Sequence, residues 1–231
     1  MKSLDLDALS TGDRYRLVSG CITPRPIAWV SSISPQGRVN LAPFSFFNAM
    51  GCDPIVFVFS PLTEVNEGEE RLKDTLRNVR SVEEGGTGEM VIHIVVESNL
   101  RQMAASAADL PPDESEVDFA GLTTAPSLKV RPPRIVESPI AFECKTLQVV
   151  RTNPGRAMSA NIVIAEAVHA WIDETLTDDG FRVDQEALRT IGRVGGPNYA
   201  TTRRLFSFGR GADALVQALP SELAPDTRDT R

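Results

Sequence analysis

The segment over residues 23–48 constrains the fold more than any other part of the chain. A β-prone apolar run over 27–33 is followed by the turn residues Pro35-Gln-Gly and by a second extended run from Val39. This pattern predicts a β-hairpin. The second run ends in side chains that combine hydrogen-bonding groups with flat apolar surface: Ser45, Phe46, Phe47 and Asn48. A flat heteroaromatic cofactor requires that mixture.

Length and charge limit the classes of protein to which the chain can belong. Its 231 residues suit one large β-rich domain or two small ones. The formal net charge of −7 argues against a broad basic surface for DNA or RNA, so we expect no nucleic-acid partner. A local basic pocket for a phosphate group is compatible with this charge, because net charge says little about one site.

The cysteines and the apolar runs indicate the cellular compartment of the protein. The three cysteines have no metal-type spacing and are odd in number, so we predict neither a disulfide framework nor a metal site. The first residues carry acids and no long apolar run, unlike a secretory signal. No stretch approaches the ~18 to 20 apolar residues that cross a bilayer. We therefore expect a soluble, cytoplasmic protein without a membrane partner.

The remaining pattern favours strands over helices. Strand-like runs lie over 15–22, 55–59, 89–96, 139–150 and 158–172. Helical spacing is confined to 71–80 and 99–108. Regular alternation of strands and helices is missing, which argues against a doubly wound parallel sheet. We predict a mainly β protein, an antiparallel barrel decorated with short helices.

The domain organisation follows from the irregular parts of the chain. Residues 1–209 are predicted to form one domain and the polar residues 210–231 a mobile tail. The proline-rich stretch 109–138 is too long for an ordinary connection, so we predict a lid or excursion that packs on the barrel or on a neighbouring subunit. The strand over 158–172 has apolar residues on both faces, which predicts burial on two sides, as at a subunit contact.

Two segments offer charge for an anion. Lys73, Thr75, Arg77 and Asn78 lie in or near the first turns of the predicted helix, where free N–H groups and the helix dipole favour a phosphate. The alternative is an ordinary surface helix. Two prolines bracket Arg25 and hold its backbone extended, which suits a guanidinium presented to an anionic partner. The alternative there is a rigid strand start with a surface arginine.

The glycines near residue 192 and the two histidines carry weaker signals. Gly192, Gly195 and Gly196 allow a close approach of backbone to a ligand, but their spacing is not the dinucleotide-binding fingerprint. The alternative is a flexible turn before a last helix. His93 and His169 lie in strands without acids or cysteines at ligand spacing, which predicts packed or surface histidines.

Five motifs in order make the chain resemble the flavin reductase-like family of FMN-binding split barrels. They are Pro24-Arg-Pro-Ile-Ala-Trp-Val, Asn40-Leu-Ala-Pro-Phe-Ser-Phe-Phe, Lys73-Asp-Thr, Phe142-Glu-Cys and Gly192-Arg-Val-Gly-Gly, within residues 15–206. The resemblance implies a split antiparallel β-barrel, a homodimer, and FMN bound with NADH or NADPH as co-substrate. It implies these cofactor-binding residues: Thr23, Pro24, Arg25, Pro26, Ser45, Phe46, Asn48, Ser60, Lys73, Asp74, Thr75 and Arg193.

The resemblance also implies roles and activities. Ser45 and Asn48 are expected to hydrogen-bond the pyrimidine edge of the flavin, and Phe46 or Phe47 to lie against its face. At least one of Phe44, Phe46 and Phe47 is expected in the core, because neighbours on a strand point to opposite faces. We predict hydride transfer from NAD(P)H to flavin, with no catalytic side chain assigned and a monooxygenase or other electron acceptor as partner. The alternatives are a flavoredoxin-like electron carrier and a barrel that has lost flavin and serves in protein interaction.

Overall fold

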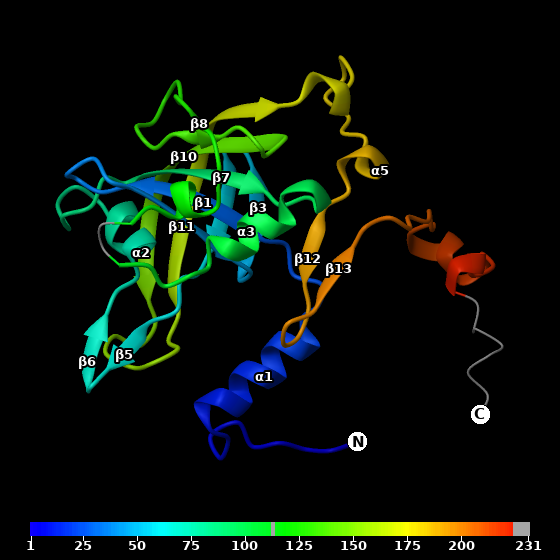
Figure 1. Cartoon of the computed structure of the whole chain (residues 1–231). Coiled ribbons are helices and arrows are strands. Elements are labelled where there is room, and N and C mark those ends of the chain that lie inside the picture. Colours follow the sequence, from blue (N-terminus) through cyan, green and yellow to red (C-terminus); the bar gives the residue numbers. More distant parts are fainter. Residues whose placement is uncertain (112–113, 224–231) are drawn as a thin grey trace.

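One antiparallel sheet of seven strands forms the body of the molecule in the computed structural model, which describes residues 1–111 and 114–223 (Figure 1). The strands lie in the spatial order β2-β1-β7-β10-β11-β4-β3, and each paired neighbour runs antiparallel. Their bounds are β1 Ala28–Ile33, β2 Val39–Phe44, β3 Phe47–Cys52, β4 Ile55–Phe59, β7 Glu89–Ile94, β10 Ile140–Arg151 and β11 Asn161–Ile172. The predicted mainly β architecture is confirmed.

Aromatic contacts show that the sheet closes on itself. Phe44 lies on β2, at one edge of the strand order, and its ring centroid is 5.4 Å from that of Phe59 on β4, near the other edge. The two edges can meet only if the sheet curls into a barrel. The enclosed core takes apolar side chains from strands on both sides of that closure, among them Ala28, Val30, Phe57, Met90, Ile92, Val163 and Ala165.

Short helices and two-stranded hairpins surround the barrel. The α-helices are α1 Thr11–Cys21, α2 Asp74–Val79, α3 Leu100–Ala105, α4 Glu116–Phe119 and α5 Gln185–Leu188. The hairpins are β5 Glu64–Asn66 with β6 Glu69–Arg71, β8 Thr124–Ala125 with β9 Arg134–Ile135, and β12 Ile191–Arg193 with β13 Tyr199–Thr201. The 3-10 helices are η1 Glu97–Asn99, η2 Glu174–Leu176, η3 Gly211–Leu215 and η4 Ser221–Leu223. No helix in these described ranges is both long and apolar enough to cross a bilayer.

The predicted strand over 15–22 is wrong, because this segment belongs to helix α1. Ser10 begins the helix: its hydroxyl accepts a hydrogen bond from the Asp13 amide at 3.1 Å. A serine before the first turn and an aspartate within it are the usual start signals of a helix. Figure 1 shows α1 standing below the barrel, beside the β12–β13 hairpin. The glycines near residue 192 lie within that hairpin, Gly192 in β12 and Gly195 and Gly196 between its two strands.

The excursion over 109–138 packs on the barrel, as predicted. The Ser31 hydroxyl on β1 donates to the Pro133 carbonyl at 2.6 Å, and the Leu41 amide on β2 donates to the Glu116 carboxylate at 3.2 Å. On strand β11, Val163 and Ala165 are buried, and Ile162 and Ile164 on the other face are half-buried in a single chain, so burial of that second face at a subunit contact stays a prediction. Of the predicted tail over 210–231, η3 and η4 are short helices and 224–231 lie outside the described residues.

Candidate functional site

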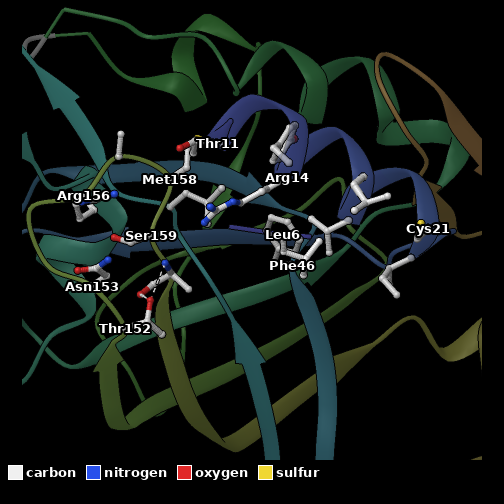
Figure 2. Close-up of a pocket in the computed structure, with 17 residues that line it drawn as sticks. Leu6, Thr11, Arg14, Cys21, Phe46, Thr152, Asn153, Arg156, Met158 and Ser159 are labelled. Carbon is white, nitrogen blue, oxygen red and sulfur yellow. Dashed lines mark hydrogen bonds between the residues drawn. The ribbon is translucent and has the colours of Figure 1, made fainter. Parts of the chain in front are cut away.

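A cavity of about 630 Å³ lies between helix α1, Phe46, Leu62 and the turn that joins β10 to β11. We call it the α1 pocket. Figure 2 shows polar side chains of the turn, including Asn153, Arg156 and Ser159, at one end, and Leu6, Phe46 and Cys21 at the other, with Arg14 between them. A volume of this size is typical of small-molecule and cofactor sites, which span roughly 300–1,000 Å³.

Arg25 holds the end of helix α1 against the barrel. Its side chain is buried, and its guanidinium donates hydrogen bonds to the carbonyls of Ser19 and Ile22 and, at 3.4 Å, to that of Val194. These carbonyls include ones that a helix end leaves without a partner, so Arg25 caps α1. The expected guanidinium held out toward an anion is not what the structure shows. The charge does approach the Phe46 ring, with Cζ 5.8 Å from the ring centroid.

Aromatic side chains form one end of the α1 pocket. Phe46 lies in the bend between β2 and β3, and its ring meets the Tyr15 ring of α1 edge to face, with centroids 6.4 Å apart. Both rings are incompletely buried, whereas Phe44 is in the core. The expectation that at least one of the three phenylalanines belongs to the core is confirmed. Flat apolar surface with an open side therefore lines the pocket.

Ser60 is the polar group beside this aromatic end. Its amide donates to the Phe46 carbonyl at 2.9 Å, which ties the end of β4 to the bend before β3. Its hydroxyl oxygen is buried and has no hydrogen-bond partner among the described residues. Buried polar atoms are almost always paired, so this hydroxyl, on a residue hydrogen-bonded to the pocket-lining Phe46, is a candidate contact for a ligand.

The start of helix α2 has most of its polar groups engaged within the protein. Thr75 is buried, and its hydroxyl accepts a hydrogen bond from the Asn40 amide at 2.8 Å. Asp74 pairs with Arg77, and the Lys73 ammonium lies 2.8 Å from a Glu64 carboxylate oxygen. Because the Lys73–Glu64 pair is partly exposed, it is weak and can exchange for another anion.

The α2 start and the polar end of the pocket are neighbours through strand β5. Residue Thr63, next to Glu64, accepts from the Met158 amide at 2.8 Å and donates its own amide to the Ser159 carbonyl at 3.0 Å. Arg156 lies in the same turn and makes no ion pair within the part of the chain that the structure describes. Arg156 therefore lines the polar end of the cavity, and Lys73 is linked to that end through Glu64 and Thr63.

A second cavity, of about 480 Å³, opens at one end of the barrel and is called here the barrel-mouth pocket. Its lining includes Pro24, Pro26, Phe47, Phe142 and Gly192. The two pockets share a wall. In residues 23–26 the prolines face the barrel mouth while Arg25 faces α1. Likewise Phe47, the first residue of β3, lines the mouth while Phe46, in the bend before β3, lines the α1 pocket.

Nine of the twelve predicted site residues fall into three places, and Asn48, Arg193 and Thr23 lie elsewhere. Arg25, Phe46 and Ser60 lie at or beside the α1 pocket, with Ser45 half-buried in the same bend; Pro24 and Pro26 line the barrel mouth; Lys73, Asp74 and Thr75 lie at α2. Asn48 is exposed on edge strand β3, and its side-chain oxygen accepts from the Ala49 amide at 2.8 Å. Arg193 pairs with Arg25 through backbone hydrogen bonds of 2.8 and 2.9 Å. The Arg193 guanidinium carbon lies 4.6 Å from the Tyr199 ring centroid. Thr23 is exposed.

Sequence reasoning missed two parts of the pocket. Helix α1 contributes Tyr15, Val18 and Cys21, and the β10–β11 turn contributes Arg156 and Ser159. The Ser10–Asp13 start signal predicts the helix but not where it packs. The residues Asn153-Pro-Gly indicate a turn, yet nothing in the sequence indicates that this turn faces α1.

Comparison with known proteins gives the family. The model of the flavin reductase like domain matches residues 19–191, most of the chain. The chain belongs to the flavin reductase-like family. An uncharacterized protein of Halalkalibacterium halodurans is 39% identical over 211 residues, covering 90% of this chain and 95% of the relative.

Solved structures agree with this family assignment. Nitrilotriacetate monooxygenase component B from Bacillus cereus has a TM-score of 0.80 and 32% identity, covering 90% of this chain and 98% of that one. A 2-nitrobenzoate 2-nitroreductase from Pseudomonas fluorescens has a TM-score of 0.78 and 31% identity, covering 95% and 99%. A split-barrel protein from Shewanella frigidimarina has a TM-score of 0.70 at 21% identity, covering 89% and 96%, and identifies the fold as a split barrel.

The family's cofactor fits the residues of the α1 pocket. A flavin needs flat apolar contacts, hydrogen-bond partners for its ring edge and positive charge for its phosphate. Phe46 and Tyr15 offer the first, the unpaired Ser60 hydroxyl is one such partner, and Lys73 with Arg156 offers the charge.

Proposed function

We propose that this protein is an FMN-dependent oxidoreductase of the flavin reductase-like family, which passes hydride from NADH or NADPH to a flavin in the α1 pocket. The unpaired Ser60 hydroxyl beside Phe46 carries the proposal, because it is a buried polar group without a partner next to flat apolar surface, as is the Arg25 Nε. Family membership and the two structural neighbours above 30% identity support it.

The proposed cofactor contacts follow the chemistry of the lining. Phe46 and Tyr15, which line the pocket, would pack on the ring, while Ser45 and Ser60, next to Phe46, would hydrogen-bond it. Asn48, exposed on edge strand β3, would do so from outside the lining. Lys73 and Arg156 would hold the phosphate. Residues Thr23–Pro26, together with Arg193, would position the wall behind the ring, and Asp74 and Thr75 would fix the start of α2.

The chain itself has little bond chemistry to perform. FMN, when bound, supplies the reactivity toward hydride. The pocket residues hold and orient the two rings, exclude water and place hydrogen-bond donors where negative charge grows on the reduced ring. No side chain is assigned as a general acid or base, because hydride transfer requires neither.

We also propose that the protein acts as a homodimer. Apolar side chains on and next to α1 support this proposal, since Tyr15, Val18 and Ile22 are all exposed in a single chain. Neighbouring exposed apolar side chains of this kind are typical of a surface that another subunit covers.

A partner that uses the electrons belongs to the same proposal. The Bacillus cereus neighbour is named as component B of a monooxygenase, which supports a monooxygenase or another electron acceptor as the partner here. All three cysteines are free, which supports a reducing compartment such as the cytoplasm.

Colour and nucleotide oxidation test the proposal. The purified protein, or apoprotein soaked with FMN, should show a bound-flavin band near ~450 nm that NADH or NADPH bleaches anaerobically. A Val18→Trp variant, which fills the α1 pocket, should lose FMN, while Val82→Trp on an exposed loop should keep it. If neither nucleotide bleached the bound flavin, the reductase activity would be rejected and the flavoredoxin-like electron carrier would be favoured. A protein that stays colourless would overturn the proposal.

A further inference from the structure

The barrel-mouth pocket is unlike the α1 pocket in its chemistry. None of its lining residues is charged, and the lining is mainly aromatic, proline and aliphatic side chains from the barrel strands, α5 and the β12–β13 hairpin. Burying an ion without a countercharge is costly. Any small molecule that fits this cavity well is therefore neutral and largely apolar.

Aromatic packing makes the floor of the barrel-mouth pocket rigid. The Phe57 ring lies between two lining residues, with its centroid 5.9 Å from that of Phe47 and 5.0 Å from that of Phe142. Phe57 itself is buried in the core. The floor is therefore an extension of the packed barrel, and flat rings pack well against such a surface.

A close backbone contact fixes the side of the pocket. A Cβ atom added at Gly192 would lie 2.7 Å from Pro24 Cβ and 3.3 Å from the Arg25 carbonyl oxygen. Glycine thus lets strand β12 lie directly against residues 23–26. The cavity is bounded there by packed main chain, which is a preformed wall.

Polar groups occur only at the rim. The Thr190 and Thr202 hydroxyls lie 3.1 Å apart and pair with each other, and the Thr201 hydroxyl donates to Glu97 at 2.6 Å. The Gln185 side chain makes no hydrogen bond to a described residue and is exposed. One amide, with a donor and an acceptor, is therefore left to orient a polar substituent on a bound ring.

We propose that the barrel-mouth pocket binds a neutral aromatic molecule of about two fused rings. Its 480 Å³ is about three times the ~150 Å³ cavity that accommodates benzene. The mouths of β-barrels are common ligand sites. The site is separate from the α1 pocket but shares the wall formed by residues 23–26, so its occupant lies one chain segment away from any ligand beside Arg25 and Phe46.

Calorimetric titration of the full-length protein with 2-naphthol tests this site. We expect saturable binding at one site per chain, and at least about tenfold weaker binding of naphthalene-2-carboxylate, whose charge has no partner there. Ala200→Phe, which fills the pocket, should weaken 2-naphthol binding at least about tenfold. Leu188→Trp repeats this test from α5 in case Ala200→Phe unfolds. Val18→Trp, in the α1 pocket, should leave 2-naphthol binding unchanged.

Three results would overturn the proposal: no binding of 2-naphthol, equal binding of the carboxylate, or wild-type affinity in both filled variants. FMN titrations of the same proteins keep this inference apart from the proposed function. Ala200→Phe should retain FMN. If Val18→Trp also retained FMN, the flavin assignment of the α1 pocket would fail while the naphthol result stood.

Discussion

Two sets of polar groups in this protein differ in how completely they are hydrogen-bonded. Glu143 and His93, buried at the barrel wall, have partners for their polar atoms. Ser60, next to Phe46, and Arg156, in the lining of the α1 pocket, have an unpaired hydroxyl and an unpaired charge. Buried unpaired atoms also occur away from this pocket, as at Gln102 and Glu137, so a group available to a ligand is identified by its place beside the pocket together with its missing partner.

Glu143 shows what a fully satisfied group does. Its buried carboxylate accepts hydrogen bonds from the Leu128 and Lys129 amides, at 2.8 and 2.5 Å, and from the Trp171 indole at 2.7 Å. Burial disfavours its charge, but these three donors outweigh that effect and lower the pKa of Glu143. The carboxylate anchors the excursion to β10, and Glu143 does not line the α1 pocket.

The largest expected effect is on stability, at Glu143. Glu143→Leu leaves three buried N–H groups without an acceptor, so the free energy of unfolding should fall by about 4 kcal/mol. Urea unfolding measures this loss, and FMN affinity of the folded fraction should not change. Glu83→Leu removes an exposed carboxylate with no hydrogen bond to a described residue and should change stability by less than about 0.5 kcal/mol. A weakened FMN affinity in Glu143→Leu would contradict the distinction between polar groups that stabilise the fold and polar groups that are available to a ligand.

The second prediction concerns acid. His93 is fully buried, its Nδ1 lies 2.8 Å from the Trp29 carbonyl oxygen, and its Nε2 accepts from the Ile135 amide at 2.8 Å. Burial, reinforced by nearby Arg134, lowers the pKa of His93 from 6.5 to about 4. The unfolded chain therefore binds a proton that the folded protein does not, between those two values. Stability from this group is complete above pH 6.5 and falls as the pH drops toward 4, by on the order of 3 kcal/mol.

Unfolding experiments at pH 7, 6, 5 and 4.5 measure that dependence as a difference between proteins. His93→Gln should be less stable at pH 7 but lose less stability on acidification than the wild type. His169→Gln, which changes a half-buried histidine on β11, should keep the wild-type slope. If the free energy of unfolding depended on pH equally in the wild type and in His93→Gln, His93 would not contribute to the loss of stability in acid.

The strands were predictable because apolar alternation and turn residues are local signals. The runs over 27–33, 55–59, 89–96 and 139–150 became β1, β4, β7 and β10 with small changes at their ends. Helix α2 was predictable for the same reason, since Leu76 and Val79 share one buried face. Segment 15–22 was misassigned because its few apolar residues fit either period, and the Ser10 cap, which decides between them, lies outside the run.

The site was less predictable, because motifs give residue types and not their partners. Arg25 and Thr75 are the types that bind anions, yet tertiary contacts direct Arg25 to the carbonyls of α1 and Thr75 to Asn40. Arg156 carries no motif and becomes a pocket residue only when the β10–β11 turn meets α1. Such long-range pairing depends on the whole fold and leaves no mark in the local sequence.

The third prediction tests the two cations at the polar end of the pocket. Lys73→Ala combined with Arg156→Ala should raise the dissociation constant of FMN about 30-fold, since each charge is expected at the phosphate. Riboflavin, which lacks the phosphate, should bind the variant and the wild type equally. Stability should change by less than about 1 kcal/mol, because the Lys73–Glu64 pair is partly exposed. Arg101→Ala, on the exposed side of α3, is the control. An equal loss of riboflavin would place these cations at the ring instead.

The smallest expected effect is at Ser60, and it is the most direct test of the comparison between paired and unpaired polar groups. Ser60→Ala removes a buried hydroxyl that has no partner in the protein, so stability should stay the same or rise slightly, while the dissociation constant of FMN should increase about fivefold. Ser32→Ala is the matched opposite: its buried hydroxyl accepts from the Asn78 amide at 3.1 Å, so stability should fall by about 1 kcal/mol with FMN affinity unchanged. Urea unfolding measures the stability of both variants, and fluorescence titration measures their affinity for FMN. If Ser60→Ala bound FMN as the wild type does, an unpaired hydroxyl would no longer identify the ligand side of this barrel.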